Sequence, residues 1–513
     1  MVDRFARTDL STTAPCDTSA QVYCGGTWKG LISKLDYIQG MGFTAVWISP
    51  IVSQIEGNTK DGSSYHGYWA KDINSLNSAF GTPDDLVALS DALHARGMYL
   101  MVDVVTNHMG YKGCRSCVDY SSLKPFSSSS YYHDPCEIDY DDQRSVELCW
   151  QGSNQVSLPD LRTEDGNVRD IWNKWARDIV DGYKIDGLRV DSVKHVETSF
   201  WPEFEKAAGV FCLGEVFHGD PAYLAPYQNY MTGLLDYPSH FWITRAFQSA
   251  TSRTGISELV AGIEKLKNTG IDTSLLGSFL ENHDQARFAH SEKDMARVKN
   301  AIAFTMLKDG IPIIYQGQEQ HYAGGDTPHN RDAIWFSKYS TGSELYKWIA
   351  SLNKIRSWAI RQDVNHLRYQ AHHVYNTGGM LVMRKGFAGY QMISLFCSHG
   401  SGTTTTLELE SHHTGFTANQ KLIDVMGCTE AVADSTGKIT LKSVDGVPVV
   451  LYPTSRLAGS GICESMTGPA NPSTSTSTSA TTTAASTTTG WTTCTTASSP
   501  RSTPPHLLRK RKP

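Results

Sequence analysis

Short apolar runs alternate with amphipathic stretches through the first two-thirds of the chain. Each run has the continuous apolar character of a strand that is buried on both faces. The stretches 83–97 and 294–310 have the apolar spacing of helices, and the first one begins with acids and ends with glycine. The pattern predicts a parallel sheet covered by helices, with strands in the segments 43–50, 98–108, 185–193, 209–217, 275–284 and 311–317.

The length of this alternating region favours a closed (β/α)8 barrel over an open sheet. We assign residues 1–107 and 162–362 to the barrel. The alternation stops over 108–161, where Cys, Tyr, Ser and Asp dominate, and we expect an inserted subdomain there. Short alternating segments over 363–463 predict an antiparallel β-sandwich domain. The Ser/Thr-rich tail 464–513 has the composition of an O-glycosylated linker, and we expect it to be disordered.

One predicted strand carries charge into the barrel. In DGLRVDSVKH (186–195), Leu188 and Val190 alternate with Arg189 and Asp191. Because residues two apart share a face of a strand, the charged pair faces the barrel axis if the apolar pair faces the helices. An adjacent guanidinium lowers the pKa of a buried carboxyl and keeps it ionised, as a nucleophile requires. This strand alone fits a structural ion pair equally well.

Carboxyls and imidazoles follow several other predicted strands at the same end. Glu215 follows the apolar run VFCL, where burial favours the protonated form of a carboxyl. Asp284 follows His283, and His108 follows Asn107. The carboxyl ends of barrel strands meet at one mouth, which is where barrel enzymes carry out chemistry. Three carboxyls at such a mouth indicate sugar chemistry, in which one attacks and another protonates the leaving oxygen.

Composition narrows the class of partner. The net charge of −6 and the pI near 6.3 argue against a nucleic-acid partner, and no apolar run is long enough to span a bilayer. Eleven cysteines indicate an oxidising compartment, although the chain opens with MVDRFARTDL rather than with an export signal. Because eleven is odd, at least one thiol lacks an intramolecular partner.

Four segments carry a family resemblance. DVVTNH, GLRVDSVKH, GEVF and FLENHD, in this order and spacing, resemble the signature segments of the α-amylase family of glycoside hydrolases. YHGYW, SLPDL and GIPIIYQGQEQHYAGG extend the similarity to secreted fungal members. The resemblance implies an α/β fold: a TIM barrel with an inserted calcium-binding subdomain and a C-terminal antiparallel β-sandwich. It also implies retaining endo-hydrolysis of internal α-1,4-glucosidic bonds in starch, glycogen and related glucans.

The resemblance assigns catalytic and substrate-binding residues. Asp191 matches the nucleophile that forms a covalent glucosyl-enzyme, and Glu215 matches the acid that protonates the glycosidic oxygen and then deprotonates water. Asp284 matches a third carboxylate that supports the distorted sugar. A lone Tyr-Trp pair would more often belong to a core, so the stacking roles of that pair rest on the resemblance. The matching substrate-binding residues are Gln21, Tyr68, Trp69, His108, Arg189, Lys194, Gly219, His283 and Arg331.

By the same resemblance, a calcium ion lies between the barrel and the insertion. Asn107, Glu147 and Asp160 match the side-chain ligands, and His195 matches a ligand that binds through its backbone carbonyl. Calcium prefers several hard oxygen ligands, which this set supplies. Without the resemblance, SLPDLRT would be interpreted as a turn with an exposed aspartate. The implied ion is structural and takes no part in bond cleavage.

The cysteines divide into expected pairs and open cases. Cys114 and Cys117 form a C-x-x-C, for which a local disulfide or free thiols fit better than a zinc site. We expect Cys212 to be buried and inert, and the pairing of Cys397 and Cys494 stays open. The resemblance implies the disulfides Cys16–Cys24, Cys136–Cys149 and Cys428–Cys463.

The chain departs from the family pattern at both ends. Family members have a longer apolar segment before the equivalent of DRF, so we expect the first barrel strand to be largely missing, an open seam and poor folding of this chain alone. A short basic tail follows the linker where relatives often carry a starch-binding domain, and we expect no such domain here. HDQARF and GGDTPHNR also differ near the cleft, which leaves the product pattern open.

Two alternatives compete with the α-amylase interpretation. A transglycosylating or maltogenic enzyme would use the same barrel and the same four segments. An inactive glucan-binding relative would fit the shortened first strand, but not the intact Asp191, Glu215 and Asp284. We expect a secreted monomer whose partner is an α-glucan, with neither nucleic acid nor a membrane as a partner.

Overall fold

The computed structural model describes residues 1–249 and 252–467. The predictions for Cys494 and for nearly all of the tail 464–513 lie outside the described residues. Within the described ranges, no helix combines the length and the apolar character needed to cross a bilayer.

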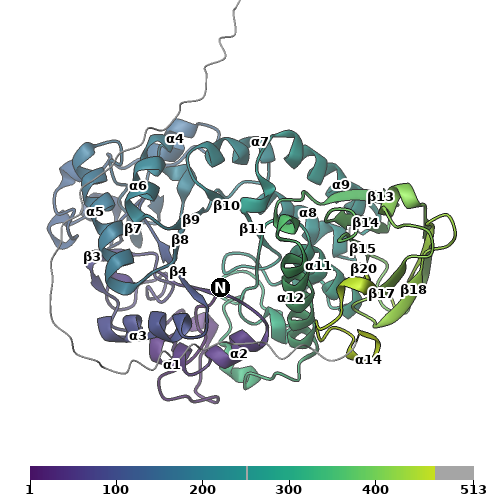
Figure 1. Cartoon of the computed structure of the whole chain (residues 1–513). Coiled ribbons are helices and arrows are strands. Elements are labelled where there is room, and N and C mark those ends of the chain that lie inside the picture. The colour runs from purple at the N-terminus through teal and green to yellow at the C-terminus, as the bar shows by residue number, and fades with distance from the viewer. Residues whose placement is uncertain (250–251, 468–513) are drawn as a thin grey trace, which may run out of the picture. The chain divides into compact units, whose positions relative to one another are not determined.

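A parallel sheet of seven strands curves into a barrel wall, and helices cover its outer face (Figure 1). Neighbours in the sheet follow one another in the sequence, and every pair is parallel. This architecture confirms the predicted α/β barrel class. The strands are β1 (Ala45–Ile48), β4 (Tyr99–Val104), β8 (Gly187–Val190), β9 (Phe211–Gly214), β10 (Gly233–Leu235), β11 (Leu276–Phe279) and β12 (Ile311–Ile313).

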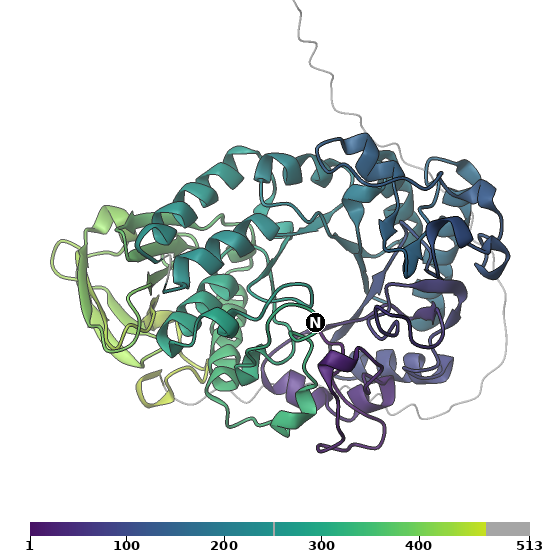
Figure 2. The same cartoon turned by 180° about the vertical axis from the view of Figure 1, so that it is seen from behind.

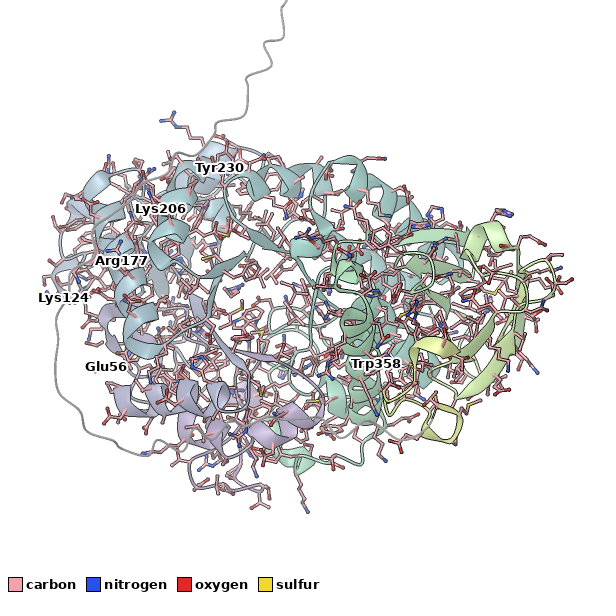
Figure 3. All side chains as sticks on the ribbon, in the orientation of Figure 1. Glu56, Lys124, Arg177, Lys206, Tyr230 and Trp358 are labelled. Carbon is pink, nitrogen blue, oxygen red and sulfur yellow. A yellow bond between two sulfur atoms is a disulfide. The ribbon has the colours of Figure 1, made fainter. Side chains whose placement is uncertain are left out.

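The covering helices bury apolar side chains against the sheet and present charged ones to solvent. Arg177 on α5 and Lys206 on α6, for example, are exposed on the outer surface (Figure 3). The helices of this region are α1 (Trp28–Ile32), α2 (Leu35–Gly40), α3 (Pro83–His94), α5 (Gly166–Tyr183), α6 (Trp201–Ala208), α7 (Pro221–Leu224), α8 (Tyr237–Phe247), α9 (Ser252–Asn268), α10 (Phe288–Ser291), α11 (Met295–Leu307) and α12 (Glu344–Gln362).

Met1 and Val2 cross the gap between the first and last strands. Val2 N donates to Trp47 O at 2.9 Å, and the amino group of Met1 donates to Ile314 O at 2.9 Å. Gln316 N in turn donates to Met1 O at 3.0 Å. These bonds lie at the carboxyl ends of β1 and β12, where an eighth strand would end. The expected open seam is therefore bridged at the mouth of the barrel.

Below this bridge the barrel wall is incomplete. No strand pairing joins β1 to β12 within the described residues, and an apolar cavity of about 450 Å³ lies between them. The helical layer outside the gap is nevertheless continuous, because α12 contacts α2 (Figure 2). Tyr346 Oη donates to Tyr37 O at 3.0 Å, and Asn353 Nδ2 donates to Met41 O at 2.8 Å. The expectation of a largely missing first strand is thus confirmed for the lower half of the wall.

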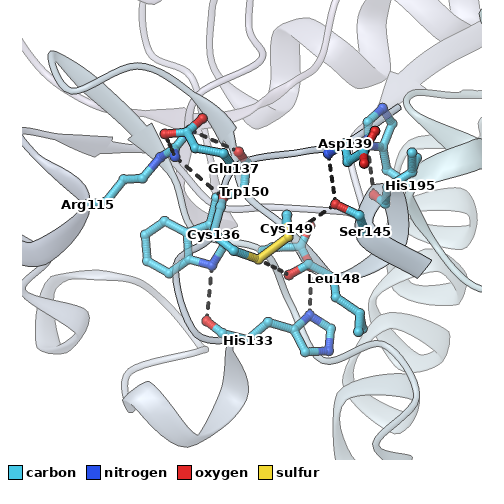
Figure 4. The surroundings of a disulfide bond; sticks show 12 residues. Arg115, His133, Cys136, Glu137, Asp139, Ser145, Leu148, Cys149, Trp150 and His195 are labelled. Carbon is cyan, nitrogen blue, oxygen red and sulfur yellow. Dashed lines mark hydrogen bonds and ion pairs between the residues drawn. A yellow bond between two sulfur atoms is a disulfide. The ribbon is translucent and has the colours of Figure 1, made fainter. Parts of the chain in front are cut away.

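An insertion of short strands and turns separates β4 from α5. Its strands β5 (Tyr111–Lys112), β6 (Gln151–Gly152) and β7 (Val156–Leu158) form a small antiparallel sheet. The Cys136–Cys149 disulfide ties the end of α4 (Gln143–Leu148) to the preceding loop (Figure 4). A hairpin of β2 (Val52–Gln54) and β3 (Ala70–Leu76) reaches the insertion, where Ile73 N donates to Lys124 O at 3.0 Å.

The C-terminal region folds into two antiparallel sheets that share one apolar core. It docks on α11, where Asn300 Nδ2 donates to Gly446 O at 2.8 Å, and a buried ion pair joins Lys385 to Asp309 at 2.6 Å. The larger sheet has the order β13 (His372–Asn376), β14 (Met380–Lys385), β15 (Met392–Cys397), β20 (Val449–Pro453), β17 (Lys421–Asp424), β18 (Thr429–Val432). The remaining elements are the paired strands β16 (Thr405–Leu409) and β19 (Ile439–Ser443), and the helices α13 (Ser411–Thr414) and α14 (Glu464–Thr467).

Eight of the described cysteines form disulfides. Cys114 pairs with Cys117 across one turn of 3-10 helix, so this C-x-x-C is a local disulfide. Cys212 and Cys397 are buried free thiols in the cores of the barrel and the C-terminal region. The other pairs are Cys16–Cys24, Cys136–Cys149 and Cys428–Cys463.

Candidate active site

Arg189 lies at the centre of a cluster of carboxyls inside the barrel. Its side chain is 1% exposed, and its Nη1 donates to Asp103 Oδ1 at 2.9 Å and to Asp191 Oδ1 at 2.8 Å. Its Nη2 lies 3.0 Å from Glu215 Oε2. Leu188 and Val190 point to the opposite side and are fully buried, as the strand alternation predicts. One guanidinium therefore holds two of the expected catalytic carboxyls next to each other.

Ser192 connects the same two carboxyls through its backbone and its side chain. It adopts a left-handed conformation (φ 52°, ψ 37°), which ends β8 and is uncommon for residues other than glycine. In this conformation Ser192 N donates to Glu215 Oε2 at 3.2 Å, while Ser192 Oγ donates to Asp191 Oδ2 at 2.7 Å. Unfavourable backbone conformations of this kind are concentrated at functional sites.

Glu215 follows β9 and is surrounded by protein. Tyr237 Oη donates to Glu215 Oε1 at 3.0 Å, and the Glu215 side chain is 11% exposed. Burial raises the pKa of Glu215 to about 7, assisted by the negative charges of Asp191 and Asp284 and opposed by Arg189. A carboxyl with a pKa near 7 is partly protonated at neutral pH, so it can act as a general acid there.

Asp103 belongs to this cluster, although the sequence argument missed it. The register of β4 and β8 places Asp103 beside Arg189. Asp103 Oδ2 also accepts hydrogen bonds from Tyr68 Oη at 2.7 Å and from Trp47 Nε1 at 3.1 Å. Burial raises the pKa of Asp103 to about 7. The signal was present, because a lone aspartate within the apolar run MVDVV is as unusual as an arginine within GLRV.

Asp284 lies at the open side of the cluster, with its side chain 39% exposed. Arg331 Nη2 contacts Asp284 Oδ1 at 3.3 Å, and Arg331 Nε donates to the carbonyl oxygen of His283 at 2.9 Å. Asp284 Oδ2 lies 3.3 Å from His283 Nε2. Burial among protein atoms in the cleft raises the pKa of Asp284, and the charge of Asp191 adds to this effect while Arg331 and Arg189 oppose it.

Tyr68 and two histidines line the wall between Asp103 and Asp284. The Tyr68 ring stacks on the His283 ring with centroids 5.5 Å apart, and Tyr68 Oη lies 2.7 Å from His283 Nε2. His108 Nε2 lies 3.1 Å from the carbonyl oxygen of Tyr68. Burial lowers the pKa of both histidines, so their imidazoles are neutral near pH 7. Neutral imidazoles can donate and accept hydrogen bonds to sugar hydroxyls.

A pocket of about 450 Å³ opens beside Glu215. Lys194 lies in its wall, with Nζ 5.0 Å from the ring centre of Tyr140 and 5.8 Å from that of Phe217. Tyr140 is 64% exposed and Phe217 is 44% exposed. Exposed aromatic faces of this kind can stack on the apolar face of a sugar ring, while the ammonium binds its hydroxyls.

The remaining expected substrate-binding residues make their recorded contacts with other parts of the chain than the carboxyl cluster. Gln21 contacts the neighbouring loop, where Ser63 N donates to Gln21 O at 2.9 Å. Trp69 packs on the apolar cluster of Ile55, Val156 and Leu158, which belongs to the hairpin and the insertion. Gly219 lies against the Phe241 ring, which is 3.3 Å from the position a Cβ would take.

The four expected calcium ligands lie in two pairs at the insertion. His108 pairs with Asp160 in an antiparallel bridge, and next to it Leu161 N donates to Asn107 O at 2.9 Å. Asn107 Oδ1 and Asp160 Oδ2 are buried without a hydrogen-bond partner. Glu147 on α4 lies beside the segment of His195, whose Nδ1 is 3.0 Å from Val146 O. Unpaired buried oxygens suit a hard cation. Among the described residues, no three His, Cys, Asp or Glu side chains could hold a metal by themselves, so such a site needs the amide and carbonyl oxygens.

Comparisons with known proteins agree with this arrangement. Residues 1–348 match the family model of the alpha amylase catalytic domain, and residues 373–471 match that of alpha-amylase domain C. Alpha-amylase 2 of Schwanniomyces occidentalis is 50% identical over 464 residues, which cover 90% of each chain. The solved alpha-amylase of Malbranchea cinnamomea has a TM-score of 0.86 and 48% identity, covering 90% of this chain and 97% of that one. The chain therefore belongs to the α-amylase family of glycoside hydrolases.

Proposed function

We propose that the protein is an endo-acting α-amylase that hydrolyses internal α-1,4-glucosidic bonds of starch-like glucans with retention of the anomeric configuration. The observation that carries this proposal is the single guanidinium of Arg189, which binds Asp191 and Glu215 through its two terminal nitrogens. Double displacement requires two carboxyls close together on opposite sides of the bond that breaks. Membership of the family supports the reaction class and the substrate class.

In the first step Asp191 is the nucleophile. Its carboxylate bonds to the anomeric carbon as the glycosidic bond breaks, and Glu215 transfers its proton to the leaving oxygen. Hydrogen bonds from Arg189 and Ser192 hold the Asp191 carboxylate in place, whereas the burial of Glu215 favours the protonated form of that carboxyl. The environments of the two carboxyls therefore suit opposite roles.

In the second step Glu215 is the general base. It takes a proton from a water molecule, whose oxygen attacks the anomeric carbon and releases Asp191 as a carboxylate. Two inversions at the same carbon give net retention. Asp284, His108 and His283 bind the sugar hydroxyls, and their hydrogen bonds become stronger as the sugar distorts toward the transition state.

We further propose that a calcium ion fastens the insertion to the barrel through Asn107, Glu147, Asp160 and the carbonyl of His195. The unpaired oxygens of Asn107 and Asp160 support this assignment. The bound ion would supply rigidity to one wall of the cleft and no chemistry to the bond cleavage. A chelator should lower the melting temperature of the protein, and Asp160→Asn should remove this sensitivity.

We propose that the protein is secreted and acts as a monomer on α-glucan. The four disulfides support an oxidising compartment, because reduced cytosols seldom preserve such bonds.

The decisive experiment compares the parent with Asp191→Ala and Glu215→Gln on soluble starch. Reducing-sugar release should fall by more than about 10³-fold in both variants. Asp36→Asn, at an 89% exposed side chain, is the control and should match the parent. NMR should detect the α-anomer as the first product of the parent.

Other results would change the proposal in defined ways. Release of the β-anomer, or full activity of Asp191→Ala, would overturn the mechanism. Early products dominated by maltose or by lengthened chains would favour a maltogenic or transglycosylating enzyme. A folded parent that binds glucan without cleaving it would favour the inactive relative.

A further inference from the structure

Asp3 is a buried carboxylate near the cleft that the proposed reaction does not use. Its side chain is 7% exposed. Tyr315 Oη donates to Asp3 Oδ2 at 2.8 Å, and Asp3 N donates to Gln316 Oε1 at 2.9 Å. The residue therefore has a fixed place next to β12, in the segment that bridges the barrel mouth.

Arg331 lies between Asp3 and Asp284. One terminal nitrogen of its guanidinium contacts Asp284 Oδ1 at 3.3 Å, and the other lies 4.0 Å from Asp3 Oδ2. The Arg331 side chain is only 5% exposed, so these carboxylates are its nearest negative charges rather than solvent ions. Arg4 Nη1 donates to Arg331 O at 3.2 Å and fixes the backbone at the same point.

The geometry of the Arg331–Asp284 pair differs from a full ion pair. An arginine and an aspartate without competitors form two parallel short hydrogen bonds that occupy both carboxylate oxygens. Here the pair has a single contact of 3.3 Å, because the Arg331 Nε is bonded to the carbonyl of His283 and its other end faces Asp3. Asp284 Oδ2 consequently has no arginine partner; its polar neighbour is His283 Nε2 at 3.3 Å, and it can still accept a hydrogen bond from a substrate hydroxyl.

We propose that Asp3 is a positioning residue, which draws Arg331 away from Asp284 and so leaves the Asp284 carboxylate free to bind the distorted sugar. This inference rests on the proposed role of Asp284. It gives the segment around Asp3 a role in positioning a catalytic-site carboxylate, in addition to its role in the barrel wall.

Electrostatics give the inference a measurable consequence. The negative charge of Asp3 contributes to the raised pKa of Asp284. Removing that charge leaves Arg331 with Asp284 as its principal counter-ion, so the pKa of Asp284 should fall. The other charged and titratable groups that face Asp284 are Arg189, Asp191, Glu215, His283, Tyr65, Tyr68 and Tyr237.

The test is the pH profile of Asp3→Asn with soluble starch as substrate. We expect kcat to fall about tenfold while KM stays within about twofold, because the lost positioning matters most in the transition state. The acidic limb of the profile should move to lower pH by roughly half a unit to one unit. A purely structural role for Asp3 would lower stability but leave that limb in place.

Matched variants separate charge from hydrogen bonding. Tyr315→Phe removes a hydrogen bond to Asp3 but keeps its charge, and its acidic limb should coincide with that of the parent. Asp3→Glu also keeps the charge, and its acidic limb should stay close to that of the parent. Asp9→Asn, at a 53% exposed ion pair with Arg7 in the same segment, controls for a surface charge.

Two outcomes would overturn the inference and a third would overturn its premise. A profile of Asp3→Asn superimposable on that of the parent would refute it, and so would an equal shift in Tyr315→Phe. If Asp3→Asn does not fold, Asp3→Ser provides the same removal of charge. Full activity of Asp284→Asn would instead refute the proposed role of Asp284 and leave the Asp3–Arg331 contact without a catalytic meaning.

Discussion

Asp103 accepts hydrogen bonds from three side chains that come from different strands or loops, and it supports the catalytic cluster without contacting a sugar in the proposed mechanism. Its partners are Arg189, Tyr68 and Trp47. Arg189 Nη1 donates to both Asp103 and Asp191, so the orientation of the Arg189 guanidinium depends on both carboxylates.

The variant Asp103→Asn should therefore lose both stability and activity. Removing one partner of a buried ion pair costs about 3–5 kcal/mol of unfolding free energy, and the misplaced Arg189 should lower kcat as well. Urea unfolding and starch hydrolysis measure the two effects, with Asp36→Asn as the exposed control. If Asp103→Asn were as stable as the parent, the charge of Arg189 would be neutralised without Asp103.

Some of these residue-level contacts follow from local patterns and others do not. The period of two in GLRVD correctly predicted that Arg189 faces the barrel interior. The bond between Arg189 and Asp103 joins residues 86 positions apart, and that between Arg331 and Asp284 spans 47 positions. Such pairs depend on the register of strands and on loop paths, and no local spacing in a single sequence contains that information.

Among the elements, α8 and α9 show how closely the covering helices pack. A Cβ on Gly262 of α9 would lie 2.4 Å from the Trp242 ring of α8, which is buried and 7% exposed. Gly182 of α5 has no atom within 4 Å of its Cβ position. Both glycines lie within helices, but only Gly262 has a buried ring next to its Cβ position.

The substitution Gly262→Ala should lower the free energy of unfolding by about 1–3 kcal/mol, because the methyl group forces the buried ring or the helix to move. Gly182→Ala should be neutral or slightly stabilising, since alanine restricts the unfolded chain more than glycine does. Thermal unfolding of both variants measures the difference. Equal melting temperatures would mean that α9 can shift away from α8 at little cost.

Element boundaries show what sequence patterns can and cannot supply. Six predicted strands correspond to β1, β4, β8, β9, β11 and β12, although each is shorter than the segment expected. The segment 98–108, for instance, is a strand only over Tyr99–Val104, since the later residues turn into the mouth and carry Asn107 and His108. The three residues of β10 (Gly233–Leu235) were missed because a run this short has no measurable period.

At the scale of the whole molecule, the two buried free thiols allow the opening of each domain to be measured. In the described part of the chain, Cys212 and Cys397 are fully shielded and every other cysteine is in a disulfide. In a chain with Cys494 replaced by serine, a colourless thiol reagent that releases a chromophore would report the opening of each domain, because Cys212 belongs to the barrel and Cys397 to the C-terminal sheets. Replacing either cysteine by serine would show which of the two domains exposes its thiol first.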